Sequence, residues 1–168
     1  PQLETENCVA HNGSIIPVPG RDIFIQAWYQ GGISVIDFTD STNPIEIAYF
    51  DRGPIHEKEL LTGGFWSVYY YQGAIYGTEI ARGLDVLKLL PSEFLSANEI
   101  TAAALAYPAM GPPKLFNPQQ QVPMVWPATP EVALAYMDQL LRSDSIHQKE
   151  ATRLTKLLNK VAVESSNW

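Results

Sequence analysis

The sequence predicts a mainly β protein, in which two β-propeller-type blades of antiparallel strands are followed by a proline-rich arm and a C-terminal helical hairpin. Apolar and polar residues alternate on both sides of Gly31-Gly32 in residues 23–38, which is typical of a β-hairpin. Residues 74–89 repeat this pattern, with Gly83 in the place of Gly32 and Val86 in the place of Val35. A strand-built repeat of about fifty residues is typical of propellers and similar radial arrays.

The first repeat is predicted to hold four strands, separated by segments rich in turn-forming residues. The second repeat opens with a strand at residues 65–71 but has no counterpart of the fourth strand, so the array is expected to end there. The four strands of the first repeat are expected near residues 8–16, 23–28, 33–38 and 45–50.

Helices are predicted only after the second repeat. Ser96 and Glu99 have the spacing of a capping box, which predicts a short helix reaching Leu105. Thr129 and Pro130 are a cap and a first-turn proline, so a helical hairpin is expected after them, broken near residues 143–145.

Between these helices, residues 108–130 contain seven of the 13 prolines and are expected to be extended. Large apolar residues in this stretch, including Phe116 and Trp126, predict that it lies against a surface. The predicted domains are residues 1–90 for the repeats, 91–128 for the short helix and arm, and 129–168 for the hairpin and tail.

Composition excludes several classes of partner. A net charge of -7 without a basic patch argues against binding to nucleic acid or an anionic membrane surface, and no apolar run is long enough to span a membrane. Cys8 is the only cysteine, so neither an internal disulfide nor a cysteine-based zinc site is expected. A chain beginning at Pro1 is expected to be a processed product or a fragment.

The first repeat resembles the LVIVD-repeat family. The resemblance lies in Ala10-His11, in the run Gly32-Ile33-Ser34-Val35-Ile36-Asp37, and in the turn from Thr39-Asp40 to Asn43-Pro44. The second repeat keeps Gly83-Leu84-Asp85-Val86 but has Trp66 in the place of His11. The resemblance covers about half the chain and implies a β-propeller-like fold and a secreted, periplasmic or cell-surface location. It implies no particular activity.

Two blades cannot close a ring, because propellers generally have about four to eight of them. The chain is therefore expected to be the C-terminal part of a larger propeller. Either upstream residues of a longer protein or another protein chain would supply the remaining blades.

The strongest candidates for ligand binding are His11, Glu79, Arg82 and Asp85. His11 could face a central channel, although fixing the start of a blade through backbone hydrogen bonds is the favoured role. Glu79 and Arg82 are close enough in sequence to form a salt bridge, and Asp85 completes this polar cluster. The aromatic residues between Phe65 and Tyr76 could stack a planar ligand or pack between blades.

Asp37, Asp40 and Asn43 are weaker candidates, for calcium, because three oxygen ligands occur at short spacing. Turn capping is the favoured explanation of Asp40. No catalytic residue and no other cofactor is predicted, because the sequence contains neither a nucleophile elbow nor a phosphate-binding loop.

The function predicted from sequence is therefore a non-catalytic secreted or envelope propeller module that acts in protein interaction or assembly. Its arm and helical hairpin would clasp the propeller or a partner subunit. The alternative is an enzyme or small-ligand-binding protein with its site in the propeller channel.

Overall fold

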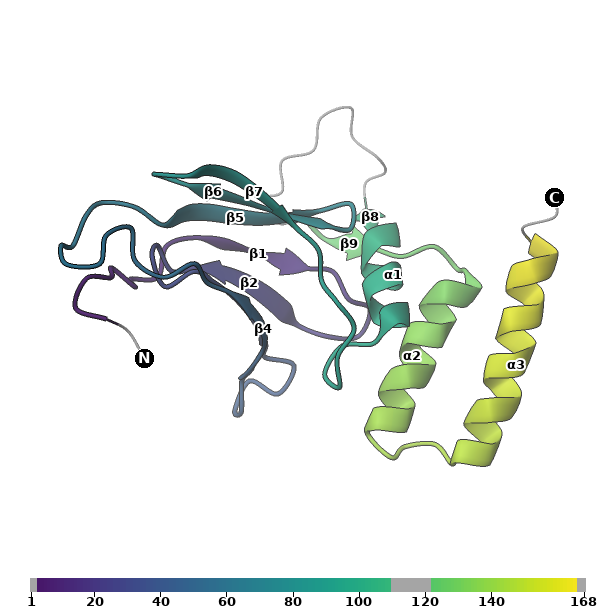
Figure 1. Ribbon diagram of the computed structural model, residues 1–168. Helices are drawn as coiled ribbons and strands as arrows, with labels where there is room; N and C mark the ends of the chain where they lie inside the picture. The colour runs from purple at the N-terminus through teal and green to yellow at the C-terminus, as the bar shows by residue number, and fades with distance from the viewer. Residues whose placement is uncertain (1–2, 110–121, 166–168) are drawn as a thin grey trace.

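The computed structural model describes residues 3–109 and 122–165. Two antiparallel sheets lie face to face, and three helices cover one end of the pair (Figure 1). The first sheet has the order β1 (Gly13–Ile16), β2 (Ile23–Ala27), β3 (Ile33–Asp37) and β4 (Ile45–Phe50). The second has the order β5 (Phe65–Tyr71), β6 (Ala74–Glu79) and β7 (Gly83–Leu87).

The two sheets share a strand pattern, as the sequence repeat predicts. Ile25 lies opposite Val35 in the first sheet, and Tyr76 lies opposite Val86 in the second. The loops from β2 to β3 and from β6 to β7 end in glycines with positive φ, 82° at Gly32 and 95° at Gly83. Glycine suits both positions because other residues rarely adopt this conformation. The prediction that the second repeat lacks a fourth strand is confirmed for the described residues.

The sheets pack with β5 against β1 and β2. A Cβ atom on Gly77 in β6 would lie 3.1 Å from Cδ1 of Ile33, so β6 approaches the first sheet closely. Between the sheets lies one continuous apolar core that also takes in part of α1. Its buried members are Ile16, Val18, Ile23, Ile25, Ala27, Ile33, Val35, Ile47, Phe65, Val68, Tyr70, Ile75, Leu95 and Ala103.

Side chains at the start of the first sheet bind the free edge of β5. The Ser14 hydroxyl accepts a hydrogen bond from the Tyr70 backbone N–H at 2.9 Å, and the Asn12 side-chain oxygen accepts one from the Val68 N–H at 3.3 Å. These N–H groups point away from β6 and would otherwise be buried without acceptors, a costly arrangement. The two bonds therefore fix how far β5 slides along β1.

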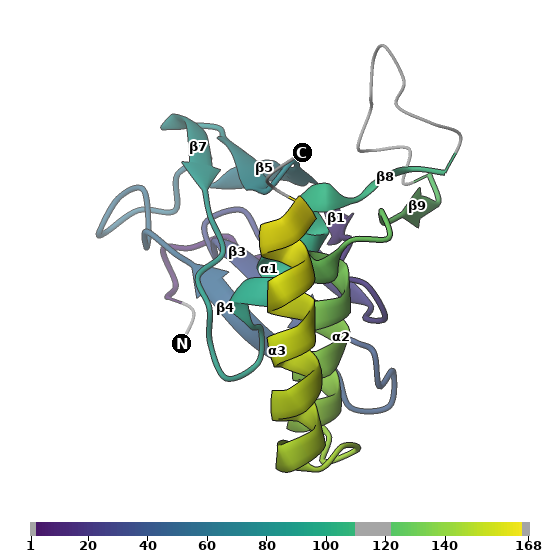
Figure 2. The same cartoon turned by 90° about the vertical axis from the view of Figure 1, so that its right-hand side faces the viewer.

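The helices are α1 (Ala97–Leu105), α2 (Pro130–Arg142) and α3 (Gln148–Ser165). They form a layered stack in which α2 packs on α1 and α3 packs on α2 (Figure 2). The predicted capping box is confirmed, because Ser96 and Glu99 each accept a hydrogen bond from the other's backbone N–H. Pro130 begins α2 as predicted, but the predicted cap at Thr129 is wrong in its chemistry, because its side chain makes no capping hydrogen bond.

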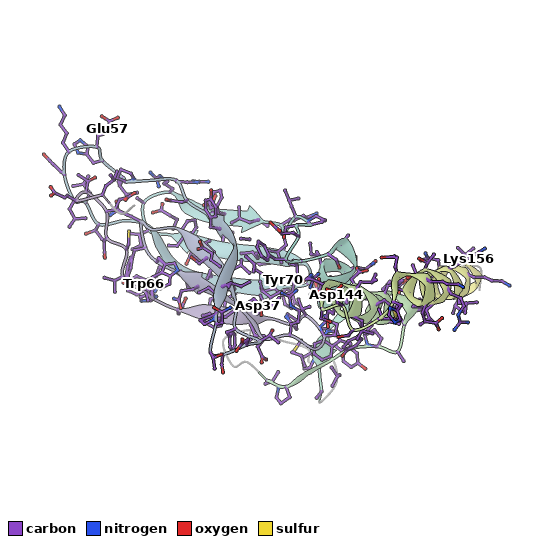
Figure 3. The ribbon with its side chains drawn as sticks, turned by 90° about the horizontal axis from the view of Figure 1, so that it is seen from below. Asp37, Glu57, Trp66, Tyr70, Asp144 and Lys156 are labelled. Carbon is purple, nitrogen blue, oxygen red and sulfur yellow. The ribbon has the colours of Figure 1, made fainter. Side chains whose placement is uncertain are left out.

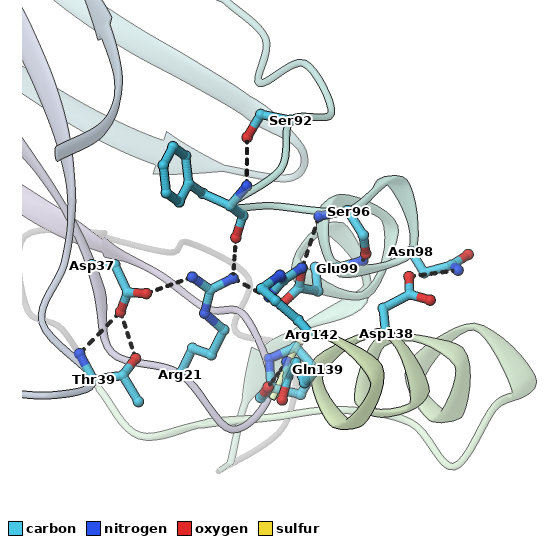
Figure 4. Close-up of polar contacts among 12 residues, drawn as sticks. Arg21, Asp37, Thr39, Ser92, Ser96, Asn98, Glu99, Asp138, Gln139 and Arg142 are labelled. Carbon is cyan, nitrogen blue, oxygen red and sulfur yellow. Dashed lines mark hydrogen bonds and ion pairs between the residues drawn. The ribbon is translucent and has the colours of Figure 1, made fainter. Parts of the chain in front are cut away.

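A buried charge network joins the helices to the first sheet (Figure 4). Glu99 has a relative exposure of 0%, and its carboxylate accepts hydrogen bonds from Arg21 at 2.8 Å and from Arg142 at 2.5 Å. Arg21 also pairs with Asp37 of β3 at 2.5 Å and donates to the Phe94 carbonyl. Burial opposes ionisation of Glu99, but the hydrogen bonds from Arg142, Ser96 and Arg21 lower its pKa below the usual value.

The arm touches the first sheet where its ends are described. Tyr107–Pro108 (β8) pairs with Met124–Val125 (β9). The Trp126 indole donates to the Pro17 carbonyl at 2.8 Å, and Gln139 of α2 donates to the Pro19 carbonyl at 2.8 Å. The prediction that the arm lies on a surface is therefore confirmed at Trp126, whereas Phe116 lies outside the described residues.

Some strand ends differ from the prediction. The first strand begins at Gly13 rather than at Cys8, although the His11 N–H donates to the Ala27 carbonyl and so extends the pairing irregularly. No closed propeller is formed by the described residues, which contain only these two sheets and the short β8–β9 pair. None of the helices in the described ranges has the length and apolar character needed to cross a membrane.

The Glu99 network gives a first prediction. Glu99→Gln should lower the free energy of unfolding by about 3–5 kcal/mol, because two guanidinium groups lose the carboxylate that they share. Urea denaturation at neutral pH measures this. Glu150→Gln is the matched control, since Glu150 pairs with Arg153 on the surface of α3 and its loss should leave the free energy of unfolding nearly unchanged. Equal losses in the two variants would contradict a structural role for Glu99.

Acid should remove the stability that the Glu99 carboxylate contributes. Because the folded pKa of Glu99 lies below its unfolded value, its stabilisation is complete above the pKa of a free glutamate and is lost as pH falls through the folded pKa. Denaturation curves over this acidic range should therefore show the wild type and Glu99→Gln converging. A stability difference that persists undiminished below the depressed pKa would contradict this expectation.

Candidate functional site

His11 belongs to a cluster of aromatic rings. Its ring centroid lies 4.3 Å from that of Trp66 and 5.2 Å from that of Tyr29, and Tyr29 meets Trp66 edge-on at 5.9 Å. The Nδ1 atom of His11 is buried without a hydrogen-bond partner. Trp66 lies toward the end of the molecule that carries the Glu57 loop, away from the helices (Figure 3). The two residues that the repeat makes equivalent thus pack on each other.

Glu79 holds a loop in place. Its side chain is 3% exposed, and its Oε1 atom accepts a hydrogen bond from the Gly64 backbone N–H. Its Oε2 atom is buried without a partner. The predicted salt bridge with Arg82 is wrong, because Arg82 is exposed and donates to the Pro54 carbonyl at 3.1 Å.

Asp85 belongs to a third set of contacts. It forms an ion pair with Arg52, whose guanidinium also lies 5.5 Å from the centre of the Phe50 ring. This pair joins the loop after β4 to the outer strand of the second sheet. His11, Glu79, Arg82 and Asp85 therefore have separate partners, and their contacts do not bring the four residues into one site.

The calcium candidates are explained by the turns that contain them. Asp37 pairs with Arg21 and accepts hydrogen bonds from Thr39, so a guanidinium lies where a cation would bind. Burial opposes its ionisation, but the bonds from Thr39 and Arg21 lower the pKa of Asp37 below its usual value. Asp40 caps Thr42, and the Asn43 N–H donates to the Asp40 carbonyl. In the described ranges no three His, Cys, Asp or Glu side chains are grouped to hold a metal.

A cavity of about 360 Å³ lies between β1, the β5–β6 hairpin, the end of α1 and the arm. Aromatic rings form much of its wall: Tyr70, Tyr71, Tyr107 and Trp126. The Tyr70 hydroxyl is buried without a hydrogen-bond partner, and burial raises the pKa of Tyr70 to about 12. Sequence reasoning missed the cavity because its walls come from segments far apart in the chain.

The largest unexplained feature is the outer face of the second sheet, which faces away from the first. The row Tyr69, Tyr76 and Val86 crosses this face, and Thr78 and Leu84 form the next row. Leu84 is 61% exposed and Val86 is 57% exposed. In both ribbon views the helices lie at the end of the sheets rather than across this face (Figures 1 and 2).

The internal repeat identifies the corresponding residues of the first sheet. Leu84 and Val86 correspond to Ile33 and Val35, which are each 2% exposed and belong to the core between the sheets. The first sheet therefore buries this face against the second sheet, whereas the second sheet leaves the same face open. The opposite face of the second sheet, which includes Val68 and Ile75, covers the first.

This packing is head to tail, because the face that the first sheet buries in the contact is not equivalent to the face that the second sheet buries. A head-to-tail contact buries different faces of its two units, so the last unit of an array that has not closed into a ring leaves one face uncovered. Apolar side chains on such a face mark a surface suited to another protein surface. The candidate functional site is accordingly the outer face of β5, β6 and β7, defined here as the open face and formed by Tyr69, Tyr76, Thr78, Leu84 and Val86.

The open face was only partly predictable from sequence. The aromatic run was predicted to pack between blades or to stack a ligand, and the structure divides it. Phe65 and Tyr70 enter the core, whereas Tyr69 and Tyr76 lie half-buried on the open face.

Comparisons with known proteins identify no relative. The chain matches no protein-family model, no curated protein and no solved structure.

Proposed function

We propose that this chain is a non-catalytic assembly module of a larger propeller-like array, in which the next β-sheet packs on the open face. Support comes from one observation above all: Ile33 and Val35 are 2% exposed, whereas their counterparts Leu84 and Val86 are 61% and 57% exposed. A further sheet on the open face would bury Leu84 and Val86 as the second sheet buries Ile33 and Val35.

The energetics favour such a contact. Complete burial of a leucine or valine side chain is worth about 1.5–3 kcal/mol, so Leu84 and Val86 together would stabilise the assembled state measurably. The half-buried Tyr69 and Tyr76 offer wide apolar surfaces beside them, and aromatic residues contribute strongly to protein interfaces.

We further propose a secreted, periplasmic or cell-surface location, which is supported by the resemblance of the first repeat to the LVIVD-repeat family. The arm and helical hairpin would serve the same assembly by sealing one end of the sheets. The separate partners of His11, Glu79, Arg82 and Asp85 give no support to a ligand site among them.

The repeat offers a matched pair of substitutions. Ile33→Ala should lower the free energy of unfolding of the chain alone by about 2–5 kcal/mol, because it opens a cavity in the core. Leu84→Ala should change it by less than about 0.5 kcal/mol, because the side chain is largely in solvent. Urea denaturation of both variants measures the difference. A large loss in Leu84→Ala would show that the open face is already covered.

A crosslinking experiment tests the assembly itself. A photoreactive benzoylphenylalanine replaces Leu84 in the natural gene product, which is irradiated in the cells that make it. We expect one defined adduct, mapped by mass spectrometry to a β-strand segment of the same longer protein or of a partner chain. Glu57, at the tip of an exposed loop, is the control position and should give no such adduct (Figure 3). No adduct from Leu84, or the same adduct from both positions, would contradict the proposal.

A further inference from the structure

The second sheet is open at an edge as well as on a face. Its strand order ends at β7, and within the described part of the chain no strand pairs with the far side of β7. Hydrogen bonds in an antiparallel ladder alternate, so every second residue of an edge strand directs its N–H and C=O away from the sheet. The structure determines which residues of β7 these are.

The N–H groups of Val68 and Tyr70 point toward Asn12 and Ser14, and therefore away from β6. Their neighbours in β5 are the residues that bond to β6. By the same alternation, Gly77 bonds to its opposite residue Asp85, and Ile75 bonds to Leu87. The backbone groups of Leu84 and Val86 are thus left facing the open edge.

The first sheet shows how the corresponding edge is used. Ile33 and Val35 of β3 lie opposite Phe50 and Ala48 of β4, which is the outermost strand of that sheet. The register of β4 shifts beside Val35 and Ile36, which places Ile47 in the core at 7% exposure, whereas Tyr49, opposite Ser34 on the other face, is 77% exposed. The repeat therefore supplies a direct example of the strand that β7 lacks.

The edge of β7 has little protection against pairing. Proteins commonly guard exposed edges with proline, inward-pointing charge or a covering segment. The strand contains no proline, and its one charged residue, Asp85, is neutralised by Arg52. The outward-facing residues Leu84 and Val86 are apolar and exposed, a combination that favours addition of a strand.

We propose that the edge of β7 binds an extended β-strand from another polypeptide segment, with the chemistry of β4: apolar residues on the side of Leu84 and Val86, and polar residues on the other. This inference rests on the proposed function and specifies its partner. The strand completes a four-stranded sheet, so the assembly would contact this chain both across the open face and along the β7 edge.

Amide hydrogen exchange tests the edge directly. The probe is a synthetic peptide with the sequence of residues 42–52, which contains β4, added to the ¹⁵N-labelled chain. We expect exchange of the Leu84 and Val86 amides to slow at least about tenfold on saturation. The amides of Asp85 and Leu87 are internal controls, because they already bond to β6 and should change little.

Chemical variants of the peptide keep the test independent of folding. In the first sheet, Phe50 and Ala48 of β4 pair with Ile33 and Val35, the counterparts of Leu84 and Val86. N-methylation of Phe50 and Ala48 in the peptide removes the N–H groups that would bond to β7, so it should abolish protection. Glu46 and Tyr49 lie opposite Ile36 and Ser34, the β3 residues that bond to β2 rather than to β4, so N-methylation at these positions should leave it intact. A peptide that gives no protection, or equal effects of the two methylation patterns, would overturn the proposal.

Two further outcomes separate the proposals. Protection of Leu84 and Val86 without peptide, together with a doubled mass by light scattering, would assign the edge to a second copy and overturn the strand partner proposed here. A defined crosslink from Leu84 combined with unprotected edge amides would retain the face contact and refute the added strand. Absence of that crosslink would refute the assembly itself.

Discussion

Two polar side chains at the start of the first sheet determine how the two sheets are arranged. Asn12 and Ser14 accept hydrogen bonds from alternate N–H groups of β5, which makes the edge of one sheet dependent on the other. Gly77 then allows β6 to approach Ile33 closely. Together these contacts impose the head-to-tail order, and that order explains why the same kind of residue is buried in the first sheet and exposed in the second.

The helices are held by a different kind of interaction. One carboxylate, Glu99, caps its own helix and also neutralises a guanidinium from the first sheet and another from the last turn of α2. Any alternative docking of α1 that separated this carboxylate from its guanidinium partners would leave a charge unpaired in the interior, which is strongly destabilising. The helical stack therefore has a single well-defined position at the end of the sheets.

Much of the fold could be predicted from the sequence, because the patterns that indicate its strands and helices lie within short segments of the chain. Alternation around Gly32 and Gly83 located the central strands, and the spacing of Ser96 and Glu99 located α1. The partners of charged residues could not be predicted in the same way. Arg82 is near Glu79 in the chain, yet it binds the Pro54 carbonyl, and Asp85 binds Arg52, because loop paths decide which charges meet. The open face could be recognised only from the repeat together with the exposure of Leu84 and Val86 in the structure.

The angle between neighbouring sheets has a quantitative consequence. When each unit is related to the next by one rotation, the ring closes only if a whole number of such rotations makes a full circle; otherwise the array continues as a superhelix. Rings of about four to eight units correspond to steps of roughly 90° to 45°. In the proposed array, the hydrogen bonds from β5 to Asn12 and Ser14, together with the close approach of β6 at Gly77, would fix the size of this step.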